Sequence, residues 1–280
     1  MILSAFADEI SSDLDEQIRT LRRLAIDHID LRSIDTVNVL SIPPEKAREI
    51  RRRLDDAGIR VATIASPIGK QSLKLAKIDA VLDDLSRAVE MCRIFGTHFI
   101  RIFSFSGDGV QPEYSRESII ARLGALAQHA REKDVTLLLE NEVGMYADTV
   151  ARSRDLLQTI NDPNLRMAFD PANFLKSGEA GGRNAFDALH PWIAQVHVKD
   201  IDGDGNIVEA GRGRADWPAI VTALVECGFH GIISLEPHLA MAGKFGGFTG
   251  ADRFELAALS LRNLLSQVVK DETQREELHI

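Results

Sequence analysis

Short apolar runs that end on an acidic or imidazole side chain recur in the second half of this chain and constrain its fold strongly. Runs of about four to six apolar residues between loop signals predict strands that are buried on both faces. The polar residues are Glu140 in TLLLEN, Asp170 in RMAFDPANF, His197 in AQVHVKD and Glu236 in IISLEP. Because helical patterns separate the runs, the strands are expected to lie parallel and to end at one edge of a sheet.

The same alternation extends over the whole chain and predicts an α/β fold, a (β/α)8 barrel. Apolar runs predict strands at residues 2–6, 26–32, 60–66, 98–103, 135–140, 165–170, 192–198 and 231–236. Helical spacing predicts helices at residues 14–24, 43–57, 79–95, 115–133, 149–160, 184–189, 216–228 and 251–268. An open doubly wound sheet is the competing architecture, but no GxGxxG follows the first strand. We expect one barrel domain over residues 1–280, with a frayed charged tail at residues 270–280.

Composition and charge exclude several classes of protein. The chain has 33 Lys and Arg against 42 Asp and Glu, a net charge of −9, so its surface repels nucleic acid. No apolar run approaches the roughly eighteen residues of a membrane span, and the segment MILSAFADEISSD is too short and too acidic for a signal peptide. Cys92 and Cys227 lie in helical patterns without metal-ligand spacing, which predicts packed core thiols in a cytoplasmic protein.

Closing the barrel would bring Glu140, Asp170, His197 and Glu236 together on its axis. Three buried carboxylates need compensation, because an unpaired buried charge costs several kcal/mol. Oxygen ligands with one nitrogen suit one divalent cation such as Mn²⁺, Mg²⁺ or Co²⁺, with Zn²⁺ as an alternative. His238 is the one further histidine expected at this edge, which leaves too few imidazoles for a cluster of three metal ions.

Polar residues beside the ligand positions are candidates for substrate binding. Glu142 either shares the site or is a solvated loop residue, and Asn173 either binds substrate hydroxyls or caps the next turn. Lys199 either orients the substrate or forms a salt bridge beside the metal ligands.

Three further residues at the same edge are also candidates for substrate binding. Lys70 and Arg101 either bind a negatively charged group of the substrate or form ion pairs at the barrel rim. His238 follows the last predicted strand closely enough to reach the substrate.

At these residues the chain resembles the xylose isomerase-like TIM barrel superfamily, in particular its sugar phosphate isomerase/epimerase group. The motifs that carry the resemblance are FADEIS, IDLR, SPIGK, LLLEN, FDPANF, VHVKD, GRGRADWPAI and GIISLEP, which together cover most of the chain. The resemblance implies a divalent metal ion bound by Glu140, Asp170, His197 and Glu236, and an acid/base pair formed by Glu140 and Glu236. It also implies a homodimer or homotetramer.

Three positions differ from the pattern of the ketose epimerases in that group. Those enzymes have a histidine where this chain has Asn173, an arginine where it has Gly203, and often a histidine where it has Glu142. The first two positions contact the reacting oxygens of the substrate in those enzymes, so they bear on which reaction this chain performs.

Together these features predict a metal-dependent isomerase or epimerase of a sugar, sugar phosphate or small hydroxy-carbonyl compound. A divalent ion that holds the carbonyl and adjacent hydroxyl oxygens stabilises an enediolate, and two carboxylates can then remove and return the proton. The alternatives are a dehydratase of the inosose dehydratase type on the same site, a non-catalytic sugar-binding accessory protein and an endonuclease IV-like nuclease. The nuclease would require a basic groove and more histidines.

Overall fold

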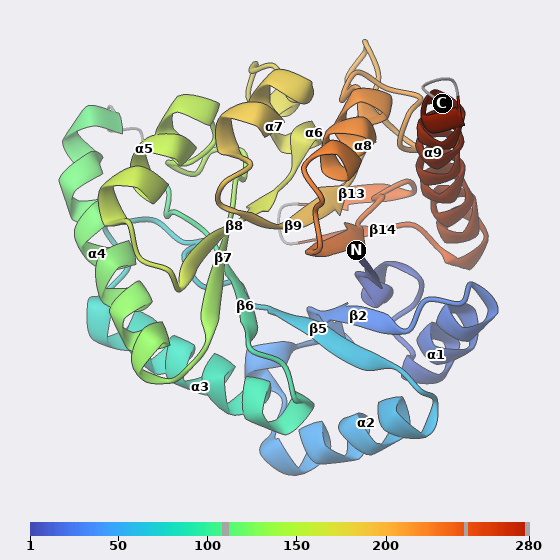
Figure 1. Cartoon of the computed structure of the whole chain (residues 1–280). Coiled ribbons are helices and arrows are strands. Elements are labelled where there is room, and N and C mark those ends of the chain that lie inside the picture. The colour runs from blue at the N-terminus through green and yellow to red at the C-terminus, as the bar shows by residue number, and fades with distance from the viewer. Residues whose placement is uncertain (108–111, 244–245, 278–280) are drawn as a thin grey trace.

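The computed structural model of the chain describes residues 1–107, 112–243 and 246–277. At its centre, one sheet of eight parallel strands curves into a barrel with helices around the outside (Figure 1). The strands are β1 (Ile2–Ala5), β2 (His28–Leu31), β5 (Arg60–Ala65), β6 (Phe99–Ile102), β7 (Thr136–Glu140), β8 (Leu165–Phe169), β9 (Ile193–Val198) and β12 (Ile232–Leu235). Their order is β1-β12-β9-β8-β7-β6-β5-β2, and β1 lies next to β2, so the barrel is nearly closed. The predicted (β/α)8 barrel is confirmed.

Helices follow the barrel strands. They are α1 (Leu14–Arg23), α2 (Pro44–Asp56), α3 (Ile78–Phe95), α4 (Pro112–Glu132), α5 (Val150–Ile160), α6 (Pro171–Lys176), α7 (Arg183–Leu189), α8 (Trp217–Glu226) and α9 (Ala251–Glu277). Local chemistry sets several ends: the Asp13 carboxylate accepts a hydrogen bond from the backbone N–H of Glu16 at the start of α1. Gly96, with φ 73°, ends α3 in the left-handed conformation that glycine adopts most easily.

Short elements lie beyond the carboxyl ends of several barrel strands. The 3-10 helix η1 (Ala7–Glu9) follows β1, and η2 (Val39–Ser41) precedes α2. Three small antiparallel pairs follow β2, β9 and β12: β3 (Ser33–Ile34) with β4 (Val37–Asn38), β10 (Asp200–Ile201) with β11 (Ile207–Val208), and β13 (Met241–Gly243) with β14 (Gly246–Phe248). These segments therefore surround the edge of the barrel at which the predicted site residues lie.

The apolar core fills the barrel and the layer between its strands and the inner faces of the helices. Residues of this layer with no exposed surface include Leu21, Leu85, Leu123, Leu156 and Leu224. Because packing on both faces holds the strands in place, the side chains at their carboxyl ends rest on a rigid frame. Of the helices that the structure describes, none combines the length and apolar character that a membrane crossing requires.

Two local features differ from the prediction. No helix was predicted between the strand at residues 165–170 and the helix at residues 184–189, but α6 lies there, because proline is compatible with the first turn of a helix. The frayed tail expected at residues 270–280 stays a prediction, since α9 extends to Glu277 and residues 278–280 lie outside the described part of the chain. Cys92 is buried as predicted, whereas Cys227 is exposed because it directly follows the last residue of α8.

Candidate active site

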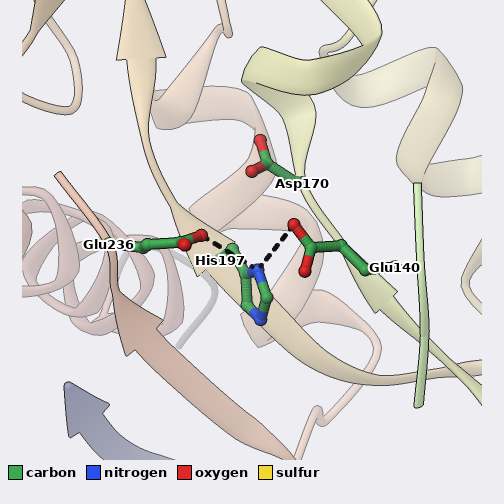
Figure 2. Close-up of side chains that lie close together, drawn as sticks. All are labelled: Glu140, Asp170, His197 and Glu236. Carbon is green, nitrogen blue, oxygen red and sulfur yellow. Dashed lines mark ion pairs between the residues drawn. The ribbon is translucent and has the colours of Figure 1, made fainter. Parts of the chain in front are cut away.

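Four neighbouring strands place the predicted metal ligands at one point. Glu140 ends β7, Asp170 directly follows β8, His197 lies in β9 and Glu236 directly follows β12. Ligand atoms from all four lie within 4.8 Å of one another, and the residues are only 2, 0, 0 and 3 % exposed, respectively. Figure 2 shows the carboxylates of Glu140 and Glu236 directed at the imidazole of His197 from opposite sides, with Asp170 above the imidazole in this view.

The cluster contains polar atoms that the protein leaves without hydrogen bonds. His197 Nδ1 lies 3.5 Å from Glu140 Oε1 and 3.3 Å from Glu236 Oε2. In the described part of the chain, neither ring nitrogen of His197 has a hydrogen-bond partner, and neither does Oε2 of Glu140 or Oε2 of Glu236. Buried polar atoms are normally paired, so these carboxylate oxygens and an imidazole nitrogen, each with a lone pair to offer, fit a bound divalent cation.

Protein cations also lie against the carboxylates of this cluster. Lys199 Nζ is 2.7 Å from Asp170 Oδ2 and 3.2 Å from Glu236 Oε2. Arg32 Nη1 donates to Glu236 Oε1 at 2.9 Å, and Arg101 Nη1 lies 3.2 Å from Glu140 Oε2. The expectation that these carboxylates need a metal ion for neutralisation is therefore too strong, because two arginines and a lysine already compensate them.

The opposite charges fix the protonation states of the metal-free cluster. Burial alone would raise the pKa of Glu140, but the positive charges of His197 and Arg101 outweigh it and lower that pKa to about 2. Burial would lower the pKa of His197, yet Glu140 and Glu236 raise it to about 10. At neutral pH Glu140 and Glu236 are thus ionised and the imidazole is protonated, so a metal ion must displace a proton to bind His197.

Asn173 connects two of the ligands through α6. Asp170 caps this helix, with its Oδ1 accepting a hydrogen bond from the backbone N–H of Asn173 at 3.0 Å. The Asn173 side-chain amide donates to Glu140 Oε1 at 3.3 Å and to the backbone oxygen of Asn141 at 3.0 Å. Asn173 therefore holds a ligand carboxylate in place, a role that neither sequence interpretation anticipated.

A cavity of about 660 Å³ opens above the cluster. Glu140 and Glu236 form part of its wall, together with all six residues predicted to bind substrate: Lys70, Arg101, Glu142, Asn173, Lys199 and His238. Two of these six form an ion pair with each other, since Lys70 Nζ lies 2.6 Å from Glu142 Oε2. Arg101 is committed to Glu140 and to backbone oxygens of Ala65 and Ser66.

The sequence interpretation missed Glu9, which fixes His238 at the cavity wall. Glu9 Oε2 accepts hydrogen bonds from the backbone N–H of His238 at 2.8 Å and from Thr249 Oγ1 at 2.7 Å. Glu9 Oε1 lies 3.0 Å from His238 Nε2, and His238 Nε2 is also 3.3 Å from Glu236 Oε1. The sequence did contain an indication of this role, since Glu9 lies in the acidic segment ADEIS, which directly follows the first predicted strand at the edge of the barrel that carries the site.

Arg32 was also missed, although it directly follows β2. Its guanidinium binds Asp8 Oδ2 at 2.8 Å and Glu236 Oε1 at 2.9 Å, and it lies 4.9 Å from the centre of the Phe6 ring. The signal was again its position, since a buried arginine at the carboxyl end of a barrel strand faces the site.

Comparison with known proteins identifies the family. The family model of the xylose isomerase-like TIM barrel matches residues 18–256. The chain belongs to this family. The fold agrees over the full length: the solved structure of the IOLI protein with a bound zinc atom has a TM-score of 0.73 at 17% identity and covers 97% of this chain and 99% of its own.

Two enzymes of known activity are related to this chain in sequence. It is 26% identical over 144 residues to 3-dehydroshikimate dehydratase of Bacillus anthracis, which is 47% of this chain and 51% of that enzyme. It is 26% identical over 180 residues to 2-epi-5-epi-valiolone 7-phosphate 2-epimerase of an Actinoplanes strain, which is 62% of this chain and 64% of that enzyme. The matches therefore span between half and two thirds of these relatives, one of which is a dehydratase and the other an epimerase.

Proposed function

We propose that this chain uses one bound divalent metal ion to transfer a proton at the carbon next to a carbonyl, as an isomerase or epimerase of a small polyhydroxy carbonyl compound. The observation that carries the proposal is the pair of buried carboxylates, Glu140 and Glu236, on opposite sides of His197 and on the wall of one cavity. Two such groups can remove a proton and return it from different directions.

Glu140, Asp170, His197 and Glu236 would hold the ion, since their ligand atoms lie together and those of Glu140, His197 and Glu236 include buried atoms without hydrogen bonds. Three carboxylates and one imidazole suit Mn²⁺, Mg²⁺ or Co²⁺, with Zn²⁺ as an alternative. When bound, the ion would stabilise the negative charge that develops on the substrate oxygens as the proton leaves.

The protein residues would position and tune the proton-transfer groups. Arg101 and Asn173 hold Glu140, while Arg32 and Lys199 hold Glu236, so each carboxylate has a fixed orientation. In the metal-free chain, the charges beside Glu140 lower its pKa to about 2 and keep it ionised. A substrate in the cavity would then lie between two carboxylates held in place by separate strands.

A dehydratase on the same site is the second candidate, and Lys199 is the observation that favours it. Its ammonium is buried beside Asp170 and Glu236, where it could donate a proton to a departing hydroxyl group. The arginine of the ketose epimerases has no counterpart here, because Gly203 lies exposed between β10 and β11. Loss of water after the first proton abstraction needs no such arginine.

Metal binding is the first test of the proposal. The wild-type chain and the variants His197→Ala and Glu236→Gln are stripped with a chelator, reloaded and analysed by mass spectrometry for metal content. We expect about one ion per wild-type chain and a loss of that ion in both variants. Glu45→Gln, on the exposed surface of α2, is the matched control and should retain the ion. A wild-type chain without metal would refute the mechanism and favour the non-catalytic binding protein.

Proton transfer itself is tested by solvent deuterium exchange. Reloaded protein is incubated in D2O with a panel of ketoses, ketose phosphates and cyclic hydroxyketones, and the substrates are followed by NMR. A substrate that gains deuterium but loses no atoms other than the exchanged hydrogen would support an isomerase or epimerase. A substrate that loses water and shows a new absorbance would support the dehydratase. Glu140→Gln should abolish exchange, and exchange that persists in this variant would contradict the role of Glu140.

A further inference from the structure

The helix α6 connects the candidate metal site to a lysine at the cavity wall. Asp170 caps the helix, Asn173 lies one turn further on, and Lys176 is its last residue. Residues three apart lie on the same side of a helix, and Asn173 and Lys176 both line the cavity. The rise of 1.5 Å per residue places Lys176 about 9 Å along the helix from Asp170. A rigid helical segment thus fixes the position of Lys176 relative to the metal ligand.

The charge of Lys176 is not neutralised by a neighbouring carboxylate. Within the described residues, no ion pair joins its ammonium to an Asp or Glu, whereas Lys70 is paired with Glu142 and Arg87 with Asp84. The other basic residues of the cavity wall, Arg32, Arg101 and Lys199, bind the carboxylates of the cluster. Lys176 is therefore the lysine of this wall whose charge is available to a ligand.

The wall as a whole carries more positive than negative charge. It contains six basic residues, Arg32, Lys70, Arg87, Arg101, Lys176 and Lys199, and four acidic residues, Asp84, Glu140, Glu142 and Glu236. The difference, six minus four, is +2 in a chain whose net charge is −9. Two of the basic residues, Arg32 and Lys199, are also paired with Asp8 and Asp170, which do not line the cavity, so the charge left for a ligand is that of Lys176.

The surroundings of the Lys176 ammonium point in the same direction. Burial and the positive charge of Lys199 lower the pKa of Lys176, although Asp170, Glu142 and Glu236 oppose this effect. Lys176 is exposed, so its ammonium is open to a ligand that enters the cavity, and an anion beside it would offset the repulsion from Lys199.

We propose that the substrate carries an anionic group, a carboxylate or a phosphate, and that Lys176 binds it at the α6 side of the cavity. This proposal rests on the proposed function, because the part of the substrate that reacts would lie at Glu140 and Glu236 while its anionic group lies at Lys176. It adds a substrate class and a specificity residue.

Binding of simple anions tests Lys176 without requiring catalysis. Inorganic phosphate and malonate are titrated calorimetrically into the full chain, both metal-loaded and chelated. At least one anion should bind the wild type, with a dissociation constant that rises about 10-fold or more in Lys176→Gln. Lys176→Arg should retain most of the affinity, and Lys133→Gln, at an exposed position outside the cavity, should retain all of it.

The two anions distinguish a phosphate site from a carboxylate site. Tighter binding of phosphate would indicate a phosphorylated substrate, and tighter binding of malonate would indicate a substrate that carries a carboxylate. Equal binding by the wild type and Lys176→Gln in both metal states would overturn the proposal, and so would the absence of any anion binding.

Turnover separates this proposal from the proposed function. Deuterium exchange is compared for pairs of hydroxyketones that differ only in a phosphate or carboxylate group. The anionic member should have a kcat/KM about 10- to 100-fold higher in the wild type, and this advantage should disappear in Lys176→Gln. Exchange with neutral compounds at equal efficiency would uphold the proton-transfer chemistry and refute the anion site. Anion binding that depends on Lys176, without any deuterium exchange, would uphold the anion site and refute the proton-transfer chemistry.

Discussion

The ammonium of Lys199 lies 2.7 Å from the carboxylate of Asp170, inside the cluster that is proposed to hold a metal ion. Both groups are buried, with Lys199 4 % exposed and Asp170 0 % exposed. The same ammonium lies 3.2 Å from Glu236. A protein cation and a metal ion would thus share the same two carboxylates, so removal of the lysine should change how strongly the fold depends on metal.

Lys199→Met should destabilise the metal-free chain by about 3 kcal/mol, because it leaves Asp170 and Glu236 buried with less compensating charge. A divalent ion can supply the missing charge, so metal should stabilise the variant more than the wild type. Urea unfolding with and without metal measures both effects. Lys133→Met, at an exposed site, is the control and should change neither value. Equal stabilisation of variant and wild type by metal would show that Lys199 does not compensate the ligands.

Gly247 lies against His238, and its substitution should test the role of that histidine. A Cβ atom at Gly247 would overlap the imidazole of His238, whose backbone already adopts the left-handed conformation at φ 51°. Gly247→Ala should therefore move the ring away from Glu236 and cost about 1 to 3 kcal/mol of stability. Deuterium exchange and urea unfolding measure the two effects.

Gly124→Ala is the matched control for Gly247→Ala, since a Cβ there meets no atom within 4 Å and the residue lies inside α4. It should stabilise the chain by about 0.5 to 1 kcal/mol. If Gly247→Ala exchanges deuterium as fast as Gly124→Ala, the position of His238 does not matter for the reaction.

The two cysteines should react at very different rates. Burial raises the pKa of Cys92 to about 12, whereas Cys227 is exposed beyond the end of α8. Because the thiolate is the reactive form, a thiol reagent at pH 8 should titrate one group rapidly in the folded chain and the second only after unfolding. Cys227→Ser should remove the rapid phase, and a rapid phase that survives in this variant would place Cys92 within reach of solvent.

The barrel and the clustering of the four candidate metal ligands could be predicted from sequence because each of these residues is marked locally. Each of the four lies in or at the end of an apolar run, and the parallel arrangement of the strands then brings them to one edge of the sheet: Glu140, Asp170, His197 and Glu236. No long-range information is needed for that step. The register within the barrel only refines it, for example by pairing His197 with Ser234 of the neighbouring strand.

The contacts that hold the ligands could not be predicted in the same way. Arg32 binds Glu236 across 204 positions of sequence, and Lys70 binds Glu142 across 72. A basic residue at a strand end has several acidic residues within reach, and only the packed structure selects among them. Lys176 could not be placed near the site from sequence for a related reason. Its position follows only once the chain after Asp170 is known to form the helix α6.

The pKa of His197 predicts how the stability of the metal-free chain depends on pH. The folded state binds a proton with a pKa of about 10, against the ordinary value of 6.5, because Glu140 and Glu236 outweigh burial. The resulting stabilisation is fully present below pH 6.5 and is lost as the pH rises towards about 10. Urea unfolding of the chelated chain across this range should therefore show a falling free energy of unfolding.

His197→Gln isolates this contribution, since glutamine has a similar size and does not titrate. The variant should show a smaller decline over the same pH range, while all other titrating groups contribute equally to both proteins. Metal should also remove the decline in the wild type, because a bound imidazole is neutral at every pH at which the metal stays bound. An identical pH dependence in the chelated wild type and His197→Gln would mean that the imidazole is not protonated between Glu140 and Glu236.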